Sequence, residues 1–282
     1  MNSRIIKQAT IAIIFLFIVV SVGYLSYQKL SSIENLCLNN QRDKDEEGID
    51  CGAVCGKNCL VIKDLEISNN QLISIGVNSA QSEFWDYDVL IEVKNPNFSH
   101  GAAGSYKLDF FNDEGEPILS KNGSFYILPG QEKILIESPI KTNDEITSFD
   151  VVFEPEWKEM KNYRGEVLFS SKRREYEILQ RPNEFGRLQG IISNESNFNF
   201  DKVDVIAVLY GVAEGEEIGG GEPILAVGKT NLETFNSKTE RFFEIKWPNR
   251  FEGTVERIDI RAYSNILDDS NLLKGEESQQ QF

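Results

Sequence analysis

Val89-Leu-Ile-Glu-Val-Lys-Asn-Pro96 is the stretch of sequence that decides the fold, because it returns 99 residues later as Leu188-Gln-Gly-Ile-Ile-Ser-Asn-Glu195. At the same offset, Ser105-Tyr-Lys-Leu-Asp-Phe-Phe111 aligns with Asp204-Val-Ile-Ala-Val-Leu-Tyr210. The runs have the period-2 pattern of strands with one buried face, and the first run of each copy ends in an asparagine turn. Two consecutive strands in one register indicate that a single β-domain is present in two copies.

Each copy continues with turns and short strands in the same order. A turn-rich segment follows at residues 112–115 in the first copy and at residues 211–215 in the second. Further hydrophobic runs are expected at residues 125–130, 133–137 and 149–153 in the first copy and at 232–237, 241–245 and 258–263 in the second. The second copy is about eight residues longer, and we expect a hairpin over residues 214–221 to account for the difference.

The spacing of these runs predicts the fold class. Short strands separated by turns, at a repeat of about 100 residues, are typical of immunoglobulin-like sandwiches. The sequence therefore predicts an all-β protein with two tandem immunoglobulin-like β-sandwiches, over residues 60–157 and 158–267, with a linker near residues 157–165. The tail, residues 268–282, is polar and Gln-rich and is expected to be disordered.

The N-terminal region contains 21 consecutive uncharged residues between Lys7 and Lys29. At about 1.5 Å rise per residue such a run spans roughly 30 Å, the hydrocarbon core of a bilayer, so we expect a transmembrane helix over residues 9–27. Basic residues precede it and every carboxylate follows Lys29, which places residues 1–8 in the cytoplasm and the bulk of the chain outside. The alternative is a signal peptide cut after Gly23, which would release a secreted protein.

The charge of the remaining chain limits the partners that it suits. Residues 30–282 carry 26 basic side chains against 45 carboxylates, a net charge of −19. Nucleic acids and anionic lipid surfaces are bound through Lys and Arg, so the sequence argues against a nucleic-acid partner. An acidic surface attracts cations or basic partners, although a solvated exterior is the more ordinary outcome.

The cysteines are confined to a short segment after the expected membrane helix. They are Cys37, Cys51, Cys55 and Cys59. In an exported chain, an even and clustered set indicates two disulfides, with three possible pairings. Structural zinc sites usually hold two well-separated cysteine pairs, so zinc is the weaker alternative. Residues 28–59 are thus expected to form a small juxtamembrane stalk with two disulfides.

Alternating carboxylates lie inside the first cysteine loop, where Asp43, Asp45 and Glu47 precede a glycine. Oxygens at positions 1, 3 and 5 of a loop resemble the start of a calcium site. Asp50 is a possible further ligand, but position 12, where an EF-hand has a bidentate glutamate, is Val54. Calcium bound by these four carboxylates is therefore one prediction, and a solvated acidic turn fixed by disulfides is the other.

Two stretches resemble known families. The pattern Cys37-x-Asn-x-x-x-Asp-x-x-Glu-x-Gly-x-Asp-Cys-Gly-x-x-Cys-x-x-x-Cys59 looks like a short cysteine-rich motif of exported bacterial proteins. The second copy, with Gly190, Asn194 and Ala207-Val-Leu-Tyr210-Gly, resembles the bacterial FxLYD-type sandwich, named for a Phe-x-Leu-Tyr-Asp signature. Here Ala207 replaces the phenylalanine and Gly211 the aspartate. These resemblances imply an exported, surface-exposed bacterial chain without catalytic activity.

Catalysis has little support in the sequence. His100 is the only histidine and lies in a polar loop, so a catalytic triad or a multi-histidine metal site would depend on it alone. The leading hypothesis is a non-catalytic envelope protein that displays its sandwiches to another envelope protein or to a glycan. A calcium-responsive stalk is the alternative, and an undetected hydrolase is the lesser one.

Overall fold

The computed structural model describes residues 13–27, 37–39, 41–43, 46, 50–56, 61–75, 85–160, 163, 165, 167–181, 184–212, 223–251 and 253–273. The chain divides into two compact units, residues 1–62 and 63–282. The boundary between them falls a few residues after the cysteine cluster.

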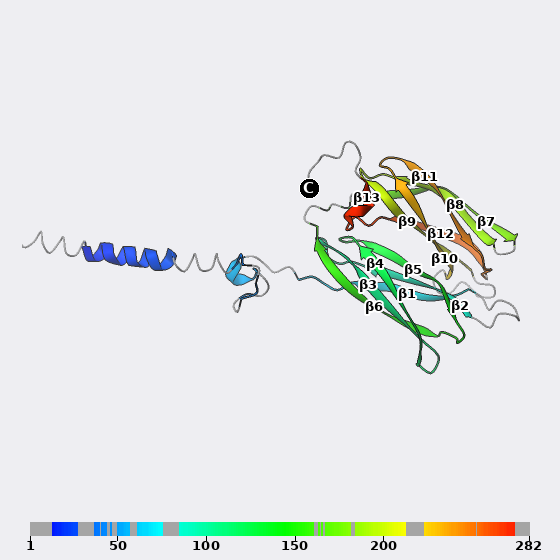
Figure 1. Ribbon diagram of the computed structural model, residues 1–282, viewed down its shortest axis with the longest axis horizontal. Helices are drawn as coiled ribbons and strands as arrows, with labels where there is room; N and C mark the ends of the chain where they lie inside the picture. The colour runs from blue at the N-terminus through cyan, green and yellow to red at the C-terminus, as the bar shows by residue number, and fades with distance from the viewer. Residues whose placement is uncertain are drawn as a thin grey trace, which may run out of the picture. The chain divides into compact units, whose positions relative to one another are not determined.

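The N-terminal unit contains a helix at residues 13–27, blue in Figure 1, and a short 3₁₀ helix, η1, at Ala53–Cys55. Among the described residues, no helix is both long and apolar enough to cross a bilayer. The 15 helical residues rise about 22 Å, less than the roughly 30 Å of a hydrocarbon core. The structure therefore does not support the spanning helix expected over residues 9–27, of which residues 9–12 lie outside the described part.

The larger unit is built from β-strands, which confirms the prediction of an all-β fold (Figure 1). The strands of the first repeat are β1 (Glu66–Ser74), β2 (Trp85–Lys94), β3 (His100–Phe111), β4 (Pro117–Ile127), β5 (Glu132–Thr142) and β6 (Ser148–Glu159). Those of the second are β7 (Phe169–Arg181), β8 (Glu184–Asn194), β9 (Asn199–Val212), β10 (Ile224–Phe235), β11 (Glu240–Trp247) and β12 (Thr254–Tyr263). Strand β6 thus runs through Trp157, where the sequence predicts the linker to begin.

The two repeats have the same sheet order. The first forms the sheets β1-β2-β5 and β4-β3-β6, and the second forms β7-β8-β11 and β10-β9-β12. The strands that carry the repeated sequences, β2 with β8 and β3 with β9, are the central strands of their sheets. Residues 99 apart in these strands therefore occupy equivalent positions in the two sandwiches.

Each pair of sheets encloses an apolar core. In the first sandwich the core side chains include Tyr87, Val89, Ile91 and Val93 of β2 and Tyr106, Leu108 and Phe110 of β3. In the second they include Leu188 and Ile192 of β8, Val205, Ala207 and Leu209 of β9, and Phe235, Phe243 and Trp247. Because successive strand residues face opposite sides, every second residue of the central strands is buried here and the others point outward.

A buried asparagine ends the repeated strand of each sandwich. Asn95 Nδ2 donates to the carbonyl oxygen of Leu128 (3.0 Å), in the turn between β4 and β5. Asn194 Nδ2, 99 residues later, donates to the carbonyl oxygen of Asn236 (3.1 Å), in the equivalent turn between β10 and β11. Both asparagines are fully buried. The asparagine turns of the sequence are thus the same internal cross-link made twice.

The second sandwich extends further than the sequence predicts. Residues 268–273, assigned to a disordered tail, include the 3₁₀ helix η2 (Asp269–Asn271) and β13 (Leu272–Leu273), which pairs with β9. The cause is specific pairing, because Asn271 Nδ2 donates to the Lys202 carbonyl oxygen (3.1 Å) and Leu272 packs on the core. Residues 274–282, and the hairpin expected at residues 214–221, lie outside the described part.

The two sandwiches pack against each other through unlike sheets. The β1-β2-β5 sheet of the first faces the β10-β9-β12 sheet of the second (Figure 1). The apolar residues of this contact, which we call the seam, are Ile73, Leu90, Ile134 and Ile136 from the first sandwich and Ile206, Val208, Val227 and Tyr263 from the second. Hydrogen bonds also cross it, since Ile134 N donates to Tyr263 Oη (3.2 Å) and Lys229 Nζ to the Ile136 carbonyl oxygen (2.9 Å).

Candidate functional site

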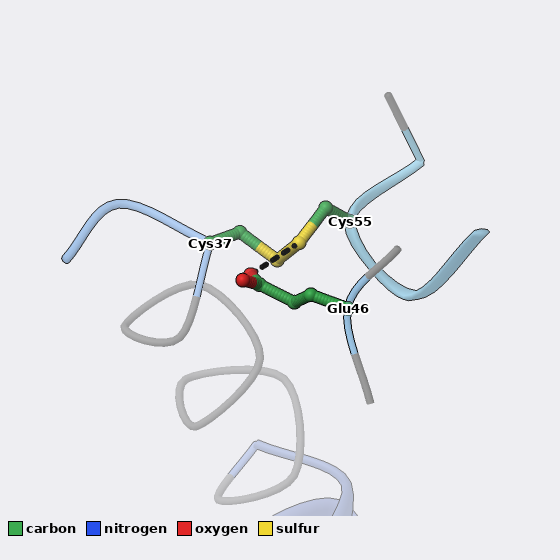
Figure 2. A group of neighbouring side chains, drawn as sticks. All are labelled: Cys37, Glu46 and Cys55. Atoms are coloured by element: carbon green, nitrogen blue, oxygen red, sulfur yellow. Dashed lines mark hydrogen bonds between the residues drawn. A yellow bond between two sulfur atoms is a disulfide. The ribbon is translucent and has the colours of Figure 1, made fainter. Parts of the chain in front are cut away.

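The cysteine loop of the N-terminal unit is closed by a disulfide between Cys37 and Cys55, whose Cα atoms are 5.5 Å apart (Figure 2). Cys51 is disulfide-bonded as well, while Cys59 lies outside the described residues. The prediction of disulfides is confirmed for these cysteines. The two sulfurs of Figure 2 and the carboxylate of Glu46 lie within 4.8 Å of one another. Disulfide sulfurs are not thiolates, however, so this group does not bind zinc while the bond is intact.

Glu46 organises the loop from its interior. Its side chain is buried, and Oε2 accepts hydrogen bonds from the backbone N–H groups of Asp43 (3.1 Å) and Asp50 (3.2 Å). Its Oε1 lies 3.1 Å from Cys55 Sγ. That contact is a close approach and not a hydrogen bond, because a disulfide sulfur carries no proton. Glu46 therefore holds two turns of the loop against the disulfide.

The two described carboxylates of the predicted calcium set are also engaged by protein donors. Asn39 Nδ2 donates to Asp43 Oδ2 (2.8 Å), and Asn39 N donates to Asp50 Oδ1 (3.0 Å). Asp45 and Glu47 lie outside the described residues. Calcium binding by Asp43, Asp45, Glu47 and Asp50 stays a prediction, and the described part of the loop is a hydrogen-bonded turn.

Residues of the cysteine-rich pattern take part in these contacts. The residues that it specifies between the first two cysteines include Asn39, Asp43, Glu46 and Asp50, and all four belong to the hydrogen-bond network. The calcium template selected Glu47 because it alternates with Asp43 and Asp45. The pattern itself names Glu46, and that was the signal that identifies the organising carboxylate.

In the larger unit, two cavities open along the seam, and Lys229 of β10 lines both. One, of about 410 Å³, is lined by residues of β3, β4, β5, β9 and β10. The other, of about 650 Å³, is lined by residues of β1, β2, β5, β10 and β11 and by the segment after β11 that includes Phe251. These are the places where polar side chains of the two sandwiches meet.

Beside the smaller cavity lies a buried lysine. Lys133 is 5% exposed, its ammonium lies over the ring of Tyr126, and it is 5.2 Å from the ring centroid of Tyr263. Burial holds the pKa of Lys133 well below its usual value, against the opposing effect of Asp204. Asp204 in turn accepts from Tyr126 Oη (3.3 Å). Lys133 thus joins rings and a carboxylate from both sandwiches, which is a structural role across the seam.

The other acid of the smaller cavity is also paired. Glu137 accepts a hydrogen bond from the hydroxyl of Tyr106 and forms an ion pair with Lys121 (2.8 Å). Burial raises the pKa of Glu137, but the hydrogen bonds from Lys121 and Tyr106 outweigh it and leave the pKa lowered. The charged groups of this cavity therefore satisfy one another.

The larger cavity differs, because its acids are incompletely paired. Asp88 is only 4% exposed, and among the described residues nothing hydrogen-bonds to its Oδ1 or to Oδ1 of Asp86. Burial, with a contribution from Asp86, raises the pKa of Asp88 to about 6, although a hydrogen bond from Ser138 and the charge of Lys229 oppose the shift. Strand periodicity alone would place Asp88 on a solvated face, and nothing in its pattern indicates that a second sandwich covers it.

Comparisons with known proteins add little to this geometry. No protein-family model and no curated protein matches the chain. Among solved structures, the chain is similar to a transglutaminase of red sea bream, at 10% identity and a TM-score of 0.22, over 74% of this chain and 30% of that one. The chain thus spans under a third of the length of that protein.

Proposed function

We propose that the chain is a non-catalytic, membrane-anchored envelope protein, whose two immunoglobulin-like sandwiches are presented outside the cytoplasm to another envelope protein or to a glycan. The observation that carries the proposal is the seam. It joins the two repeats into one rigid body. A protein that displays or spaces other components needs such rigidity, and two loosely tethered domains would lack it.

The composition of the seam supports a rigid body. Contacts between domains of one chain are usually polar enough to allow relative motion. Here the central residues of both sheets are apolar, and Leu90 and Val208 are fully buried. The hydrogen bond from Lys229 to the Ile136 carbonyl oxygen further ties β10 to β5. A partner that binds one sandwich would therefore be held in a fixed orientation to the other.

The N-terminal unit supports export. The disulfide between Cys37 and Cys55 suits an oxidising compartment, and a net charge of −19 beyond residue 29 suits a solvated surface. Membrane anchoring rests on the uncharged run between Lys7 and Lys29. The FxLYD-type resemblance of the second repeat points the same way, since such domains are generally exported or tethered.

The other two hypotheses have weaker support. A calcium-responsive stalk would have to recruit Asp43 and Asp50 from their hydrogen bonds with Asn39. A glycoside hydrolase needs carboxylates on both sides of the scissile bond. Asp86 and Asp88 lie two residues apart on the same strand and so form one wall of their cavity. This arrangement favours binding over hydrolysis.

In-cell photo-crosslinking tests the proposal. A photoreactive residue at Val152 on β6 or at Phe242 on β11, which are 56% and 59% exposed on the two outer sheets, should trap a specific envelope partner. The same residue at Val54, in the N-terminal unit, controls for proximity to the membrane. Recovery of the monomer alone from both outer positions would remove the support for an interaction module. Extraction of the chain by carbonate without detergent would remove the support for an anchor.

A further inference from the structure

Asp88 is a buried acidic residue next to the apolar residues of the seam. The outward position that it occupies on β2 corresponds to Arg187 on β8, where the side chain is paired with Glu177 (Nε to Oε1 2.8 Å) on an open face. The next outward residue of β2, Leu90, is apolar and buried in the seam. A buried carboxylate with an unpaired oxygen is costly, so Oδ1 of Asp88 calls for a counterpart beyond Ser138 and the charge of Lys229.

The backbone also departs from the repeat at this point. In the ladder between β2 and β5, two residues, Ser138 and Pro139, lie opposite Asp88, between the pairs made by Tyr87 and Val89. The equivalent ladder between β8 and β11 is uninterrupted. Bulges recur beside binding sites, where they redirect a side chain. The hydroxyl of Ser138 is thereby brought to Asp88.

The cavity in front of Asp88 has the volume and lining of a ligand site. It measures about 650 Å³ and has Asp86, Asp88, Ser138 and Lys141 on the side of the first sandwich. On the side of the second sandwich it is lined by apolar residues that include Trp247 and Phe251, and by Lys229 and Lys246. Each of these lysines has a partner other than Asp88, namely Asp86 Oδ1 for Lys141 (3.8 Å), the Ile136 carbonyl oxygen for Lys229 (2.9 Å) and Glu184 Oε1 for Lys246 (3.1 Å). Acceptors on one wall and rings on the other suit a ligand with a cationic head and an apolar stem.

We propose that this cavity binds the lysine or arginine side chain of a basic partner protein, with its ammonium or guanidinium group on Asp86 and Asp88 and its stem against Trp247 and Phe251. The partner as source of the cation rests on the proposed function, and the charge of −19 beyond residue 29 favours a basic partner. A divalent metal is a poorer fit. Among the described residues, no third His, Cys, Asp or Glu side chain joins the two carboxylates.

The chemistry of the cavity is tested by titrating the full-length chain with butylguanidinium, and with butylurea as its neutral isostere, in a calorimeter. We expect butylguanidinium to bind and butylurea not to. Asp88→Asn should weaken binding at least about tenfold, because it removes the charge from the hydrogen bond, and Asp86→Asn should weaken it by a smaller factor. Asp150→Asn, at an exposed position of β6, is the matched control and should leave binding unchanged.

Equal binding of the two probes, or equal affinity of the wild type and Asp88→Asn, would overturn the site. The first of these outcomes needs only the wild-type protein, so a variant that fails to fold does not block the test. A blocked Gly-Gly-Arg-Gly-Gly peptide tests the source of the cation. If butylguanidinium binds and the peptide is excluded, the partner side chain is the wrong occupant.

The outcome is separable from that of the proposed function. Absence of butylguanidinium binding together with a trapped partner at Val152 or Phe242 would refute the cation site and leave the interaction module intact. Binding of the peptide with no partner trapped in cells would support the cation site and remove the support for the interaction module.

Discussion

The outward faces of β3 and β9 occupy the same place in the two sandwiches but carry opposite chemistry. On β3, Lys107 and Asp109 form an ion pair (2.8 Å) on an open face. Their equivalents on β9, 99 residues later, are Ile206 and Val208, which are buried in the seam. The shared pattern of inward residues builds the sandwich in both repeats. The outward residues decide which sheet is covered by a second sandwich.

The other side of the seam shows the same contrast in reverse. On the first sandwich, Leu90 and Ile136 are apolar and buried against the second. Their equivalents on the open sheet of the second sandwich are Gln189 and Glu244, which hydrogen-bond to each other (2.7 Å). Each sandwich therefore has one docking face and one solvated face, and the docking faces belong to non-equivalent sheets.

The largest expected effect comes from replacing an apolar residue of the seam by the charged residue found at the equivalent position of the open face. Val208→Asp, which copies Asp109, should destabilise the chain by about 4 kcal/mol or more, because a carboxylate replaces a fully buried side chain. The sandwiches should then separate, and small-angle scattering should show an increased radius of gyration. The reciprocal change, Asp109→Val, is the control and should leave the radius unchanged. A Val208→Asp protein as compact and as stable as the wild type would show that the seam does not hold the repeats together.

The next effect concerns Asp88, whose side chain is buried at the seam. Its folded-state pKa is raised from 3.8 to about 6, so the native state holds the proton more tightly than the unfolded state does. The contribution of Asp88 to stability is therefore fully present at pH below about 4 and is lost as the pH rises through about 6, by about 3 kcal/mol in total. Asp88→Asn should remove this dependence.

Urea unfolding of the wild type and of Asp88→Asn between pH 4 and pH 7 measures the difference. The two proteins should converge at pH 4, and the variant should be the more stable at pH 7. Asp150→Asn should follow the wild type at every pH, since Asp150 is exposed. A constant difference between wild type and Asp88→Asn would mean that Asp88 does not titrate in this range. Asp86, Lys229 and Lys121 also act on the pKa of Asp88, so the comparison is made on these isosteric variants.

The sandwiches could be predicted because the alternation that indicates each strand is local in the sequence and occurs in both repeats. Alternation over 89–93 and 105–111, repeated at an offset of 99, gives the central strands and their asparagine turns. The seam could not be predicted in the same way, because the position of an outward residue in a strand does not show whether solvent or another sheet lies over it. The contrast of Lys107 with Ile206 was present in the aligned repeats, but its meaning depends on a contact between distant parts of the chain.

The candidate sites show the same limit at shorter range. In the cysteine loop, alternate spacing selected Glu47, whereas the buried carboxylate is its neighbour Glu46. An irregular turn has no fixed period, so spacing does not predict which side chain faces inward. Asp88 was missed for the opposite reason. Its strand is regular, and regular alternation assigns it to solvent until the second sandwich is in place.

A moderate and equal effect is expected at the internal cross-links that the repeats share. Asn95→Ala and Asn194→Ala each remove a fully buried amide together with its hydrogen bonds, to the Leu128 carbonyl oxygen in the first sandwich and to the Asn236 carbonyl oxygen in the second. Each should cost about 2 kcal/mol in the free energy of unfolding, measured in urea. Asn122→Ala, at an exposed position of β4, controls for the loss of an amide and should have little effect. A loss confined to one repeat would show that the two asparagines are not equivalent.

The smallest change in stability, with a distinct change in association, is expected on the open sheet of the second sandwich. Gln189→Leu with Glu244→Ile copies Leu90 and Ile136 and should alter the stability of the monomer by about 0.5 kcal/mol or less. It also joins the exposed Phe242 into a continuous apolar face, because Phe242 is 59% exposed on the same strand as Glu244. Such a face has no second sandwich to cover it, so sedimentation velocity should show dimers. Asp150→Val, opposite Asp109 on the other open sheet, should stay monomeric because its neighbours are charged. If the double variant is monomeric too, apolar outward residues alone are insufficient to make a docking face.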